Sequence, residues 1–116
     1  MSAEAFVGAA TRGDEATVRS VLLSRSVDPN VLDPKAGSTA LMGAAFLGHA
    51  SVVTLLLADN RVDPNMAGQD GYTALMVAAA KEHVMVVTLL LGDDRVDPNM
   101  ANQNGNTALV IAALKG

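Results

Sequence analysis

Residues 37–70, "GSTALMGAAFLGHASVVTLLLADNRVDPNMAGQD", decide the fold because the chain repeats them. Residues 71–104, "GYTALMVAAAKEHVMVVTLLLGDDRVDPNMANQN", match at 23 of the 34 positions, and a shorter copy, "GNTALVIAALKG", starts at residue 105. An upstream copy, "AFVGAATRGDEATVRSVLLSRSVDPN", starts at Ala5. A period of this length predicts stacked supersecondary units rather than one globular fold.

Each unit reads as two short helices followed by a turn. Thr39 precedes an Ala-rich run, where its hydroxyl can accept a free backbone N–H, and Leu41, Ala44 and Ala45 recur at the spacing of a buried helical stripe. Gly48 is expected to end this helix. The run "VVTLLL" predicts a second helix covered on both sides, and "VDPN" ends it through the proline ring.

The two ends of the chain differ from the middle. Thr17 and Ser20 stand where the inner units have apolar residues, which predicts a polar N-terminal cap. The last unit has only one helix, so part of its apolar surface is expected to lack cover: Leu89, Leu90, Leu109 and Leu114. The first unit also has one extra residue, in "VLDPKAG", which is expected to lengthen a loop.

Composition narrows the functional classes. The 116 residues contain no cysteine and no apolar run near the ~20 residues that a membrane helix needs, so we expect a single intracellular, cytoplasmic domain with no membrane partner. A net charge of −4 with eight scattered basic residues argues against nucleic acid. No signature of a hydrolase, metalloprotease or nucleotide-binding loop is present, so no cofactor and no catalysis are expected.

The two histidines, His49 and His83, occupy equivalent positions before the second helices. We expect them to cap those helices. A zinc site is the less favoured alternative, because zinc takes three or four ligands and neither cysteine nor paired carboxylates accompany them. Asp59 and Asp93 stand near Arg61 and Arg95, and we expect them to be solvated or paired rather than catalytic.

The differences between the copies point to a binding surface. In the first helix the copies differ at three positions that share one face: Gly43 against Val77, Phe46 against Ala80, and Leu47 against Lys81. The same face holds Gly8, Thr11 and Arg12 in the first unit and Ile111 and Leu114 in the last. Phe46 and Leu47 either pack beneath the adjacent loop or form an apolar patch for a partner.

The chain resembles the ankyrin-repeat family over its whole length, through units of 34–35 residues that carry "GxTALM", "GH..VV.LLL" and "VDPN". It departs from the family's T-P-L-H at two positions. Ala40, Ala74 and Ala108 replace the proline, and Met42, Met76 and Val110 replace the histidine. The resemblance implies an all-α solenoid with repeats at about 3–36, 37–70 and 71–104 and a partial repeat at 105–116.

The resemblance also implies a function and several residue roles. Ankyrin repeats bind partner proteins with the first-helix face and the loop tips. These tips are Lys35, Ala36 and Ser38, then Gln69, Asp70 and Tyr72, then Gln103, Asn104 and Asn106. Glu82 replaces a glycine that the family holds in a left-handed conformation, which implies strain of about 1 kcal/mol. Asn30, Asn65 and Asn99 match an asparagine that some ankyrin repeats carry hydroxylated.

We therefore expect a non-catalytic scaffold that binds a partner protein. The predicted contact residues are Thr11, Arg12, Gly43, Phe46, Leu47, Tyr72, Val77, Ala80, Lys81 and Ile111. The alternative is self-association, as a dimer or an end-to-end assembly, through the uncovered C-terminal helix.

Overall fold

The computed structural model describes residues 1–115, which contain seven helices and no strand. The helices are α1 (Ala3–Arg12), α2 (Glu15–Ser24), α3 (Ala40–Leu47), α4 (Ala50–Leu57), α5 (Ala74–Ala80), α6 (Val84–Leu91) and α7 (Ala108–Lys115). A single β-bridge joins Asp33 and Ser38. The prediction of an all-α repeat fold is confirmed, and Gly116, the last residue of the expected partial repeat, lies outside the described residues.

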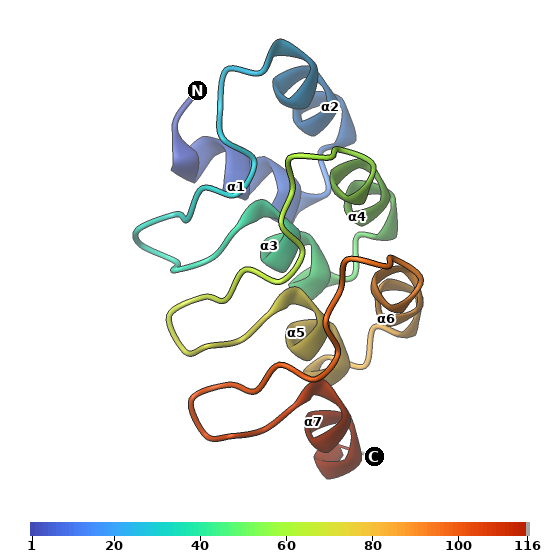
Figure 1. The fold of residues 1–116 in the computed structure, drawn as a ribbon. Coiled ribbons are helices and arrows are strands. Elements are labelled where there is room, and N and C mark those ends of the chain that lie inside the picture. The colour runs from blue at the N-terminus through green and yellow to red at the C-terminus, as the bar shows by residue number, and fades with distance from the viewer. Residues whose placement is uncertain (116) are drawn as a thin grey trace.

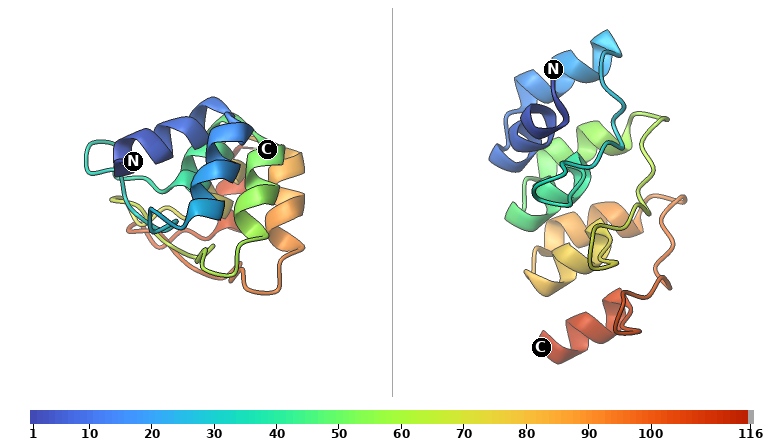
Figure 2. Two further views of the ribbon diagram at one scale, coloured as in Figure 1. Left: turned by 90° about the horizontal axis from the view of Figure 1, so that it is seen from above. Right: turned by 90° about the vertical axis from the view of Figure 1, so that its left-hand side faces the viewer.

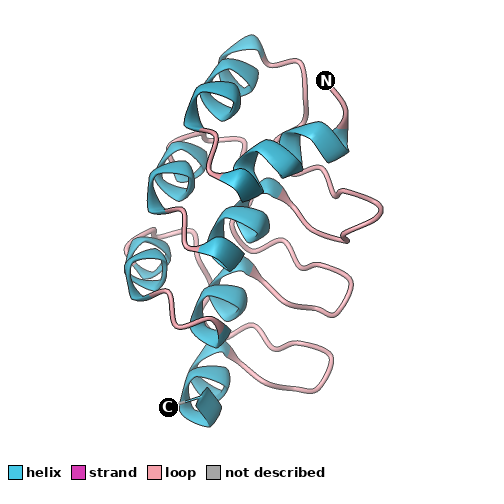
Figure 3. Cartoon of the chain, turned by 180° about the vertical axis from the view of Figure 1, so that it is seen from behind, coloured by secondary structure: helices cyan, strands magenta, loops and turns pink. Residues whose placement is uncertain are grey.

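The helices form two layers that run along a stack (Figure 1). The first helices, α1, α3, α5 and α7, pack in sequence to form one layer, and α2, α4 and α6 form the other. The loops that precede α3, α5 and α7 project to the same side of the stack and lie roughly parallel to one another (Figure 3). The molecule measures 39 × 25 × 22 Å, and the side view shows the successive repeats stacked along its length (Figure 2).

Local chemistry starts and ends the helices as the sequence predicts. The Thr39 hydroxyl accepts the N–H of Met42 at 3.3 Å, and the Thr73 hydroxyl accepts the N–H of Met76 at the same distance. Gly48 ends α3 in the left-handed conformation at φ 74°. Glu82 is also left-handed, at φ 59°, which confirms the expectation at this non-glycine position.

Small side chains let neighbouring helices approach closely. Ala40, Ala44 and Ala45 of α3 are fully buried, and the larger side chains of the second layer fill the remaining space. Leu90 was expected to lack cover, and this expectation is wrong. Its side chain is fully buried in the core, as is that of the equivalent residue Leu56 in α4.

Leu89 was also expected to lack cover, but it is partly buried against the core, as Leu55 is in the preceding repeat; at the other residues the ends of the stack differ as expected. Thr17 donates its hydroxyl to Asp14 at 2.7 Å, and Ser20 is exposed, so the outer side of α2 is polar. Leu109 of α7 is 79% exposed, whereas the equivalent Leu41 is 4% exposed. The apolar end is therefore at α7.

The extra residue of the first unit lies in a loop, as expected, since the segment bridged by Asp33 and Ser38 precedes α3. Among residues 1–115, no helix is long and apolar enough to cross a membrane.

Candidate functional site

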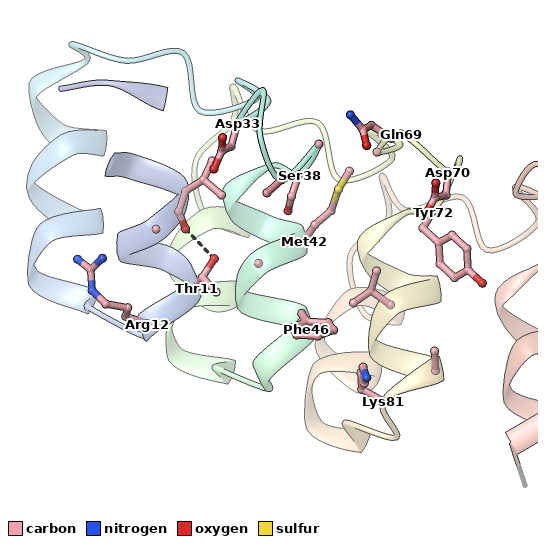
Figure 4. Close-up of a pocket in the computed structure, with 18 residues that line it drawn as sticks. Thr11, Arg12, Asp33, Ser38, Met42, Phe46, Gln69, Asp70, Tyr72 and Lys81 are labelled. Atoms are coloured by element: carbon pink, nitrogen blue, oxygen red, sulfur yellow. Dashed lines mark hydrogen bonds between the residues drawn. The ribbon is translucent and has the colours of Figure 1, made fainter. Parts of the chain in front are cut away.

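A groove of about 810 Å³ lies along the first-helix layer, between the helices and the loop tips. Its floor comes from α1, α3 and α5, and its wall comes from the loops before α3 and α5 (Figure 4). The lining residues are Val7, Gly8, Thr11, Arg12, Asp33, Ala36, Gly37, Ser38, Met42, Gly43, Phe46, Gly68, Gln69, Asp70, Tyr72, Val77, Ala80 and Lys81.

The groove brings together most of the residues that sequence comparison singled out. From that set it includes Thr11, Arg12, Gly43, Phe46, Tyr72, Val77, Ala80 and Lys81, with the tip residues Ala36, Ser38, Gln69 and Asp70. It does not include Leu47 or Ile111. Leu47 is 50% exposed outside the groove, and Ile111 is buried in the stack. The tip residues Lys35, Gln103, Asn104 and Asn106 also lie outside it.

Gly8 and Gly43 stand where later repeats hold Val77 and Ile111, and side chains of the first repeat occupy the space beside both glycines, since a Cβ added at Gly8 would lie 3.3 Å from Nη1 of Arg12. The Thr11 hydroxyl donates to the carbonyl of Val7 at 2.8 Å, and a Cβ added at Gly43 would collide with this hydroxyl. A side chain at Gly43 therefore requires Thr11 to move. Gly43 therefore lets α1 and α3 approach closely, and Thr11 covers this part of the floor.

Phe46 forms the apolar centre of one edge of the groove. Its side chain is 45% exposed, so it does not pack beneath the adjacent loop. The Lys81 ammonium lies 4.8 Å from the centre of the Phe46 ring, a cation–π contact between neighbouring repeats. Tyr72, at the opposite edge, is half-buried against the core rather than fully exposed at its tip.

The histidines do not have the capping role expected from the sequence. His49 and His83 stand at the N-cap positions of α4 and α6, but neither side chain makes a capping hydrogen bond. The His83 Nε2–H donates to the carbonyl of Phe46 at 3.0 Å, which fixes the tautomer of the ring. Each ring packs against the glycine that ends the preceding first helix, within 2.8 Å of a Cβ built on Gly13 and 2.7 Å of one built on Gly48.

Two arginines join the repeats in a way that the sequence did not reveal. Arg61 and Asp59 form a 2.8 Å ion pair, and Arg61 also donates to the carbonyl of Leu22 in the preceding repeat at 3.0 Å. The hydrogen bond from Arg61 holds the pKa of Asp59 below its ordinary value, against the opposing effect of burial. The recurring Asp-x-Arg spacing was the available signal, but sequence alone does not show which backbone lies within reach.

The second joint repeats this arrangement. Arg95 pairs with Asp93 at 2.8 Å and donates to the carbonyls of Val62 and Leu57 at 2.9 and 2.6 Å. Its hydrogen bond to Asp93 lowers the pKa of that carboxyl group below the ordinary value. Both aspartates are therefore parts of the scaffold.

Comparison with known families agrees with this geometry. Residues 6–102 match a family model described as ankyrin repeats in three copies. The chain belongs to the ankyrin-repeat family, whose members are generally non-catalytic protein interaction modules. A comparison with curated proteins finds no match to this chain.

Proposed function

We propose that this chain is a non-catalytic module that holds a partner protein in the groove formed by α1, α3, α5 and their loop tips. The observation that carries the proposal is the exposed ring of Phe46 at the edge of a groove of about 810 Å³. A half-exposed aromatic ring in a concave, mostly apolar groove provides an anchor point for a partner side chain. The cysteine-free sequence supports an intracellular, reducing compartment for this interaction.

The rigid setting of the groove supports the same proposal. Its floor consists of helices whose buried faces are filled by the core, and its walls are tied by backbone hydrogen bonds such as Gly68 N–H to the carbonyl of Tyr72 at 2.9 Å. A preorganised surface loses little conformational entropy when a partner binds. Loop tips with different side chains in each repeat can then determine which partner fits.

Peptide selection on the immobilised full chain tests this proposal. We expect selected peptides to lose binding to Phe46→Asp, since the charge replaces the apolar anchor. They should keep binding to Leu23→Asp, a matched change at a residue of α2 that is 77% exposed and outside the groove. Equal binding to both variants, or failure to select any peptide, would contradict the proposed site.

Self-association is the second candidate, and the exposed face of α7 favours it. Leu109 and Leu114 are 79% and 76% exposed, while Leu41 and Leu75, the equivalents of Leu109, are each 4% exposed because the next repeat covers them. A second copy of the chain could cover the same face. Each large aliphatic side chain that becomes buried stabilises such a dimer by about 1.5–3 kcal/mol.

Light scattering over a concentration series tests this second candidate. A dimer that Leu109→Gln with Leu114→Gln converts into a folded monomer would support it. A monomer at every concentration would remove it and leave the groove as the proposed interaction site.

A further inference from the structure

The charges along the groove identify the kind of partner, given the proposed function on which this step rests. We propose that the groove binds an extended acidic peptide segment, with two carboxylates that flank one bulky apolar side chain. The carboxylates face Arg12 and Lys81, and the apolar side chain lies against Phe46. The contacts and charges of these residues lead to this assignment.

Basic residues recur at one position of the first helix. Arg12, Leu47, Lys81 and Lys115 are equivalent residues of successive repeats, so three of the four are cationic. They stand at the C-terminal ends of α1, α3, α5 and α7, where all four side chains are exposed. Arg12 and Lys81 line the groove on the same edge as Phe46 (Figure 4).

The two groove cations are only weakly neutralised by the protein itself. Arg12 lies 3.9 Å from Asp14, at the limit of an ion pair, and its side chain is 66% exposed. Asp14 is held elsewhere, since its carboxylate accepts the hydroxyl of Thr17 at 2.7 Å and its backbone N–H at 3.2 Å. Among residues 1–115, no carboxylate forms an ion pair with Lys81, whose ammonium rests over the Phe46 ring.

The opposite edge of the groove carries the acidic side chains, so the groove is polarised across its width. Asp70 is exposed at the second loop tip. Asp33 is only 8% exposed, and its carboxylate already accepts the N–H of Lys35 at 2.9 Å. An extended strand alternates its side chains between two sides, so it can direct carboxylates toward Arg12 and Lys81 and a hydrogen-bond donor toward Asp70.

The distance along the stack sets the spacing of the two acidic residues. Arg12 and Lys81 belong to helices two steps apart, and packed helices are separated by about 8–10 Å, which gives roughly 16–20 Å. An extended chain advances about 3.3 Å per residue, so a spacing of six residues covers this distance with both side chains on the same side of the strand. The apolar residue then falls near the middle, where Phe46 and Gly43 belong to the intervening repeat.

A polyanion such as nucleic acid fits this surface less well than a short acidic peptide. The whole chain has a net charge of −4, and Asp70 faces the groove, so a long row of phosphates would be repelled outside the basic edge. A short segment places its two charges only where the cations lie.

Selection from a random nonapeptide phage library on the full chain tests the inference. We expect enrichment of Asp or Glu at two positions six apart, with an aromatic or aliphatic residue between them. The selected peptides, measured by fluorescence anisotropy, should bind Arg12→Gln or Lys81→Gln about two- to fivefold more weakly and the double variant about tenfold more weakly. The salt dependence should flatten in the double variant, while Arg19→Gln, an equal charge change on α2, should bind as the wild type does.

The outcomes separate this inference from the proposed function. Neutral or basic peptides that still lose binding to Phe46→Asp would overturn the acidic partner and leave the groove as the binding site. Failure to select any groove-dependent peptide would overturn both. Binding of a 20-nucleotide single-stranded DNA that is lost in the double variant, without enrichment of acidic peptides, would assign the basic edge to nucleic acid and overturn the inference.

Discussion

The hydrogen-bonded contacts between neighbouring repeats, which we call joints, are nearly the same at each step of the stack. The residues of the groove differ from one repeat to the next. At the two joints the same atoms make the same bonds, with Asn30 Nδ2 donating to the carbonyl of Arg61 at 2.7 Å and Asn65 Nδ2 donating to that of Arg95 at 2.8 Å. The same asparagine makes a second bond across the first joint, since Asn30 Oδ1 accepts the N–H of Asp63 at 2.6 Å. In the groove, by contrast, the equivalent positions hold Gly43 and Val77.

This difference shows which residues the scaffold requires and which it leaves free. A joint works only if each side chain reaches a backbone group of the next repeat, so its residue types are restricted by distance and direction. The groove face contacts no further layer of the protein. Exposed residues on this face, such as Phe46, can therefore differ from repeat to repeat, and under our proposal they determine which partner binds.

The largest effect is expected from a side chain added at Gly48, where it would collide with His83 of the next repeat. Ala at this position must adopt φ 74° and place its Cβ 2.7 Å from Nδ1 of His83. We expect Gly48→Ala to lower the free energy of unfolding by about 3 kcal/mol, from the left-handed strain and the collision together. Urea denaturation measures the loss.

Two further variants separate the two causes. With His83→Ala in the same chain the collision disappears, so Gly48→Ala should then cost only the conformational strain of about 1–2 kcal/mol. Glu82→Gly removes the same strain at a position that has no glycine, and it should stabilise the protein by about 1 kcal/mol. An equal cost of Gly48→Ala with and without His83 would show that the imidazole does not restrict this turn.

Much of the fold could be predicted because its signals are local. The threonine caps and the buried alanine stripe each depend on neighbours within a few residues, so one repeat contains the information, whereas the left-handed conformation of Glu82 was implied by the family resemblance. The varying positions of the first helix also predicted most of the first-helix residues that line the groove, since residues three and four apart share a helical face.

The remaining features depend on how one repeat is placed against the next. The sequence around His49 and His83 does not indicate that each ring packs against a glycine of the preceding repeat. Helix capping was therefore the simplest interpretation. Leu90 likewise belongs to a helix in which every residue except Thr88 is apolar, so the sequence does not show which residue points inward. Such contacts are set by the distance between repeats, which the sequence does not encode in any single unit.

Removal of a joint side chain should have an intermediate effect. Asn65→Ala removes the bond to the carbonyl of Arg95 and the acceptor for the N–H of Asp97, and we expect a loss of about 1–2 kcal/mol in unfolding free energy. Asn99 is the matched control from the last "VDPN", because its side chain makes no hydrogen bond to residues 1–115. A similar loss in Asn99→Ala would indicate a general effect of the turn instead of the joint.

The smallest effect is expected from the ion pair at the second joint, and it depends on pH. The folded state lowers the pKa of Asp93 through the hydrogen bond from Arg95, so the folded protein binds this proton less readily than the unfolded chain does. The resulting stabilisation is complete above the unfolded pKa and is lost as the pH falls through the lowered folded value. Asp93→Asn should cost less than about 1 kcal/mol at neutral pH.

The pH profile distinguishes this pair from general surface charge. Between about pH 5 and pH 3 the wild type should lose stability more steeply than Asp93→Asn, since the amide cannot ionise and that variant lacks the shifted group. Asp94→Asn is the control, because Asp94 is adjacent and exposed but forms no ion pair within residues 1–115. If both variants kept the wild-type slope, Arg95 would hold the joint through the carbonyls of Val62 and Leu57 alone, and the ion pair would contribute nothing to it.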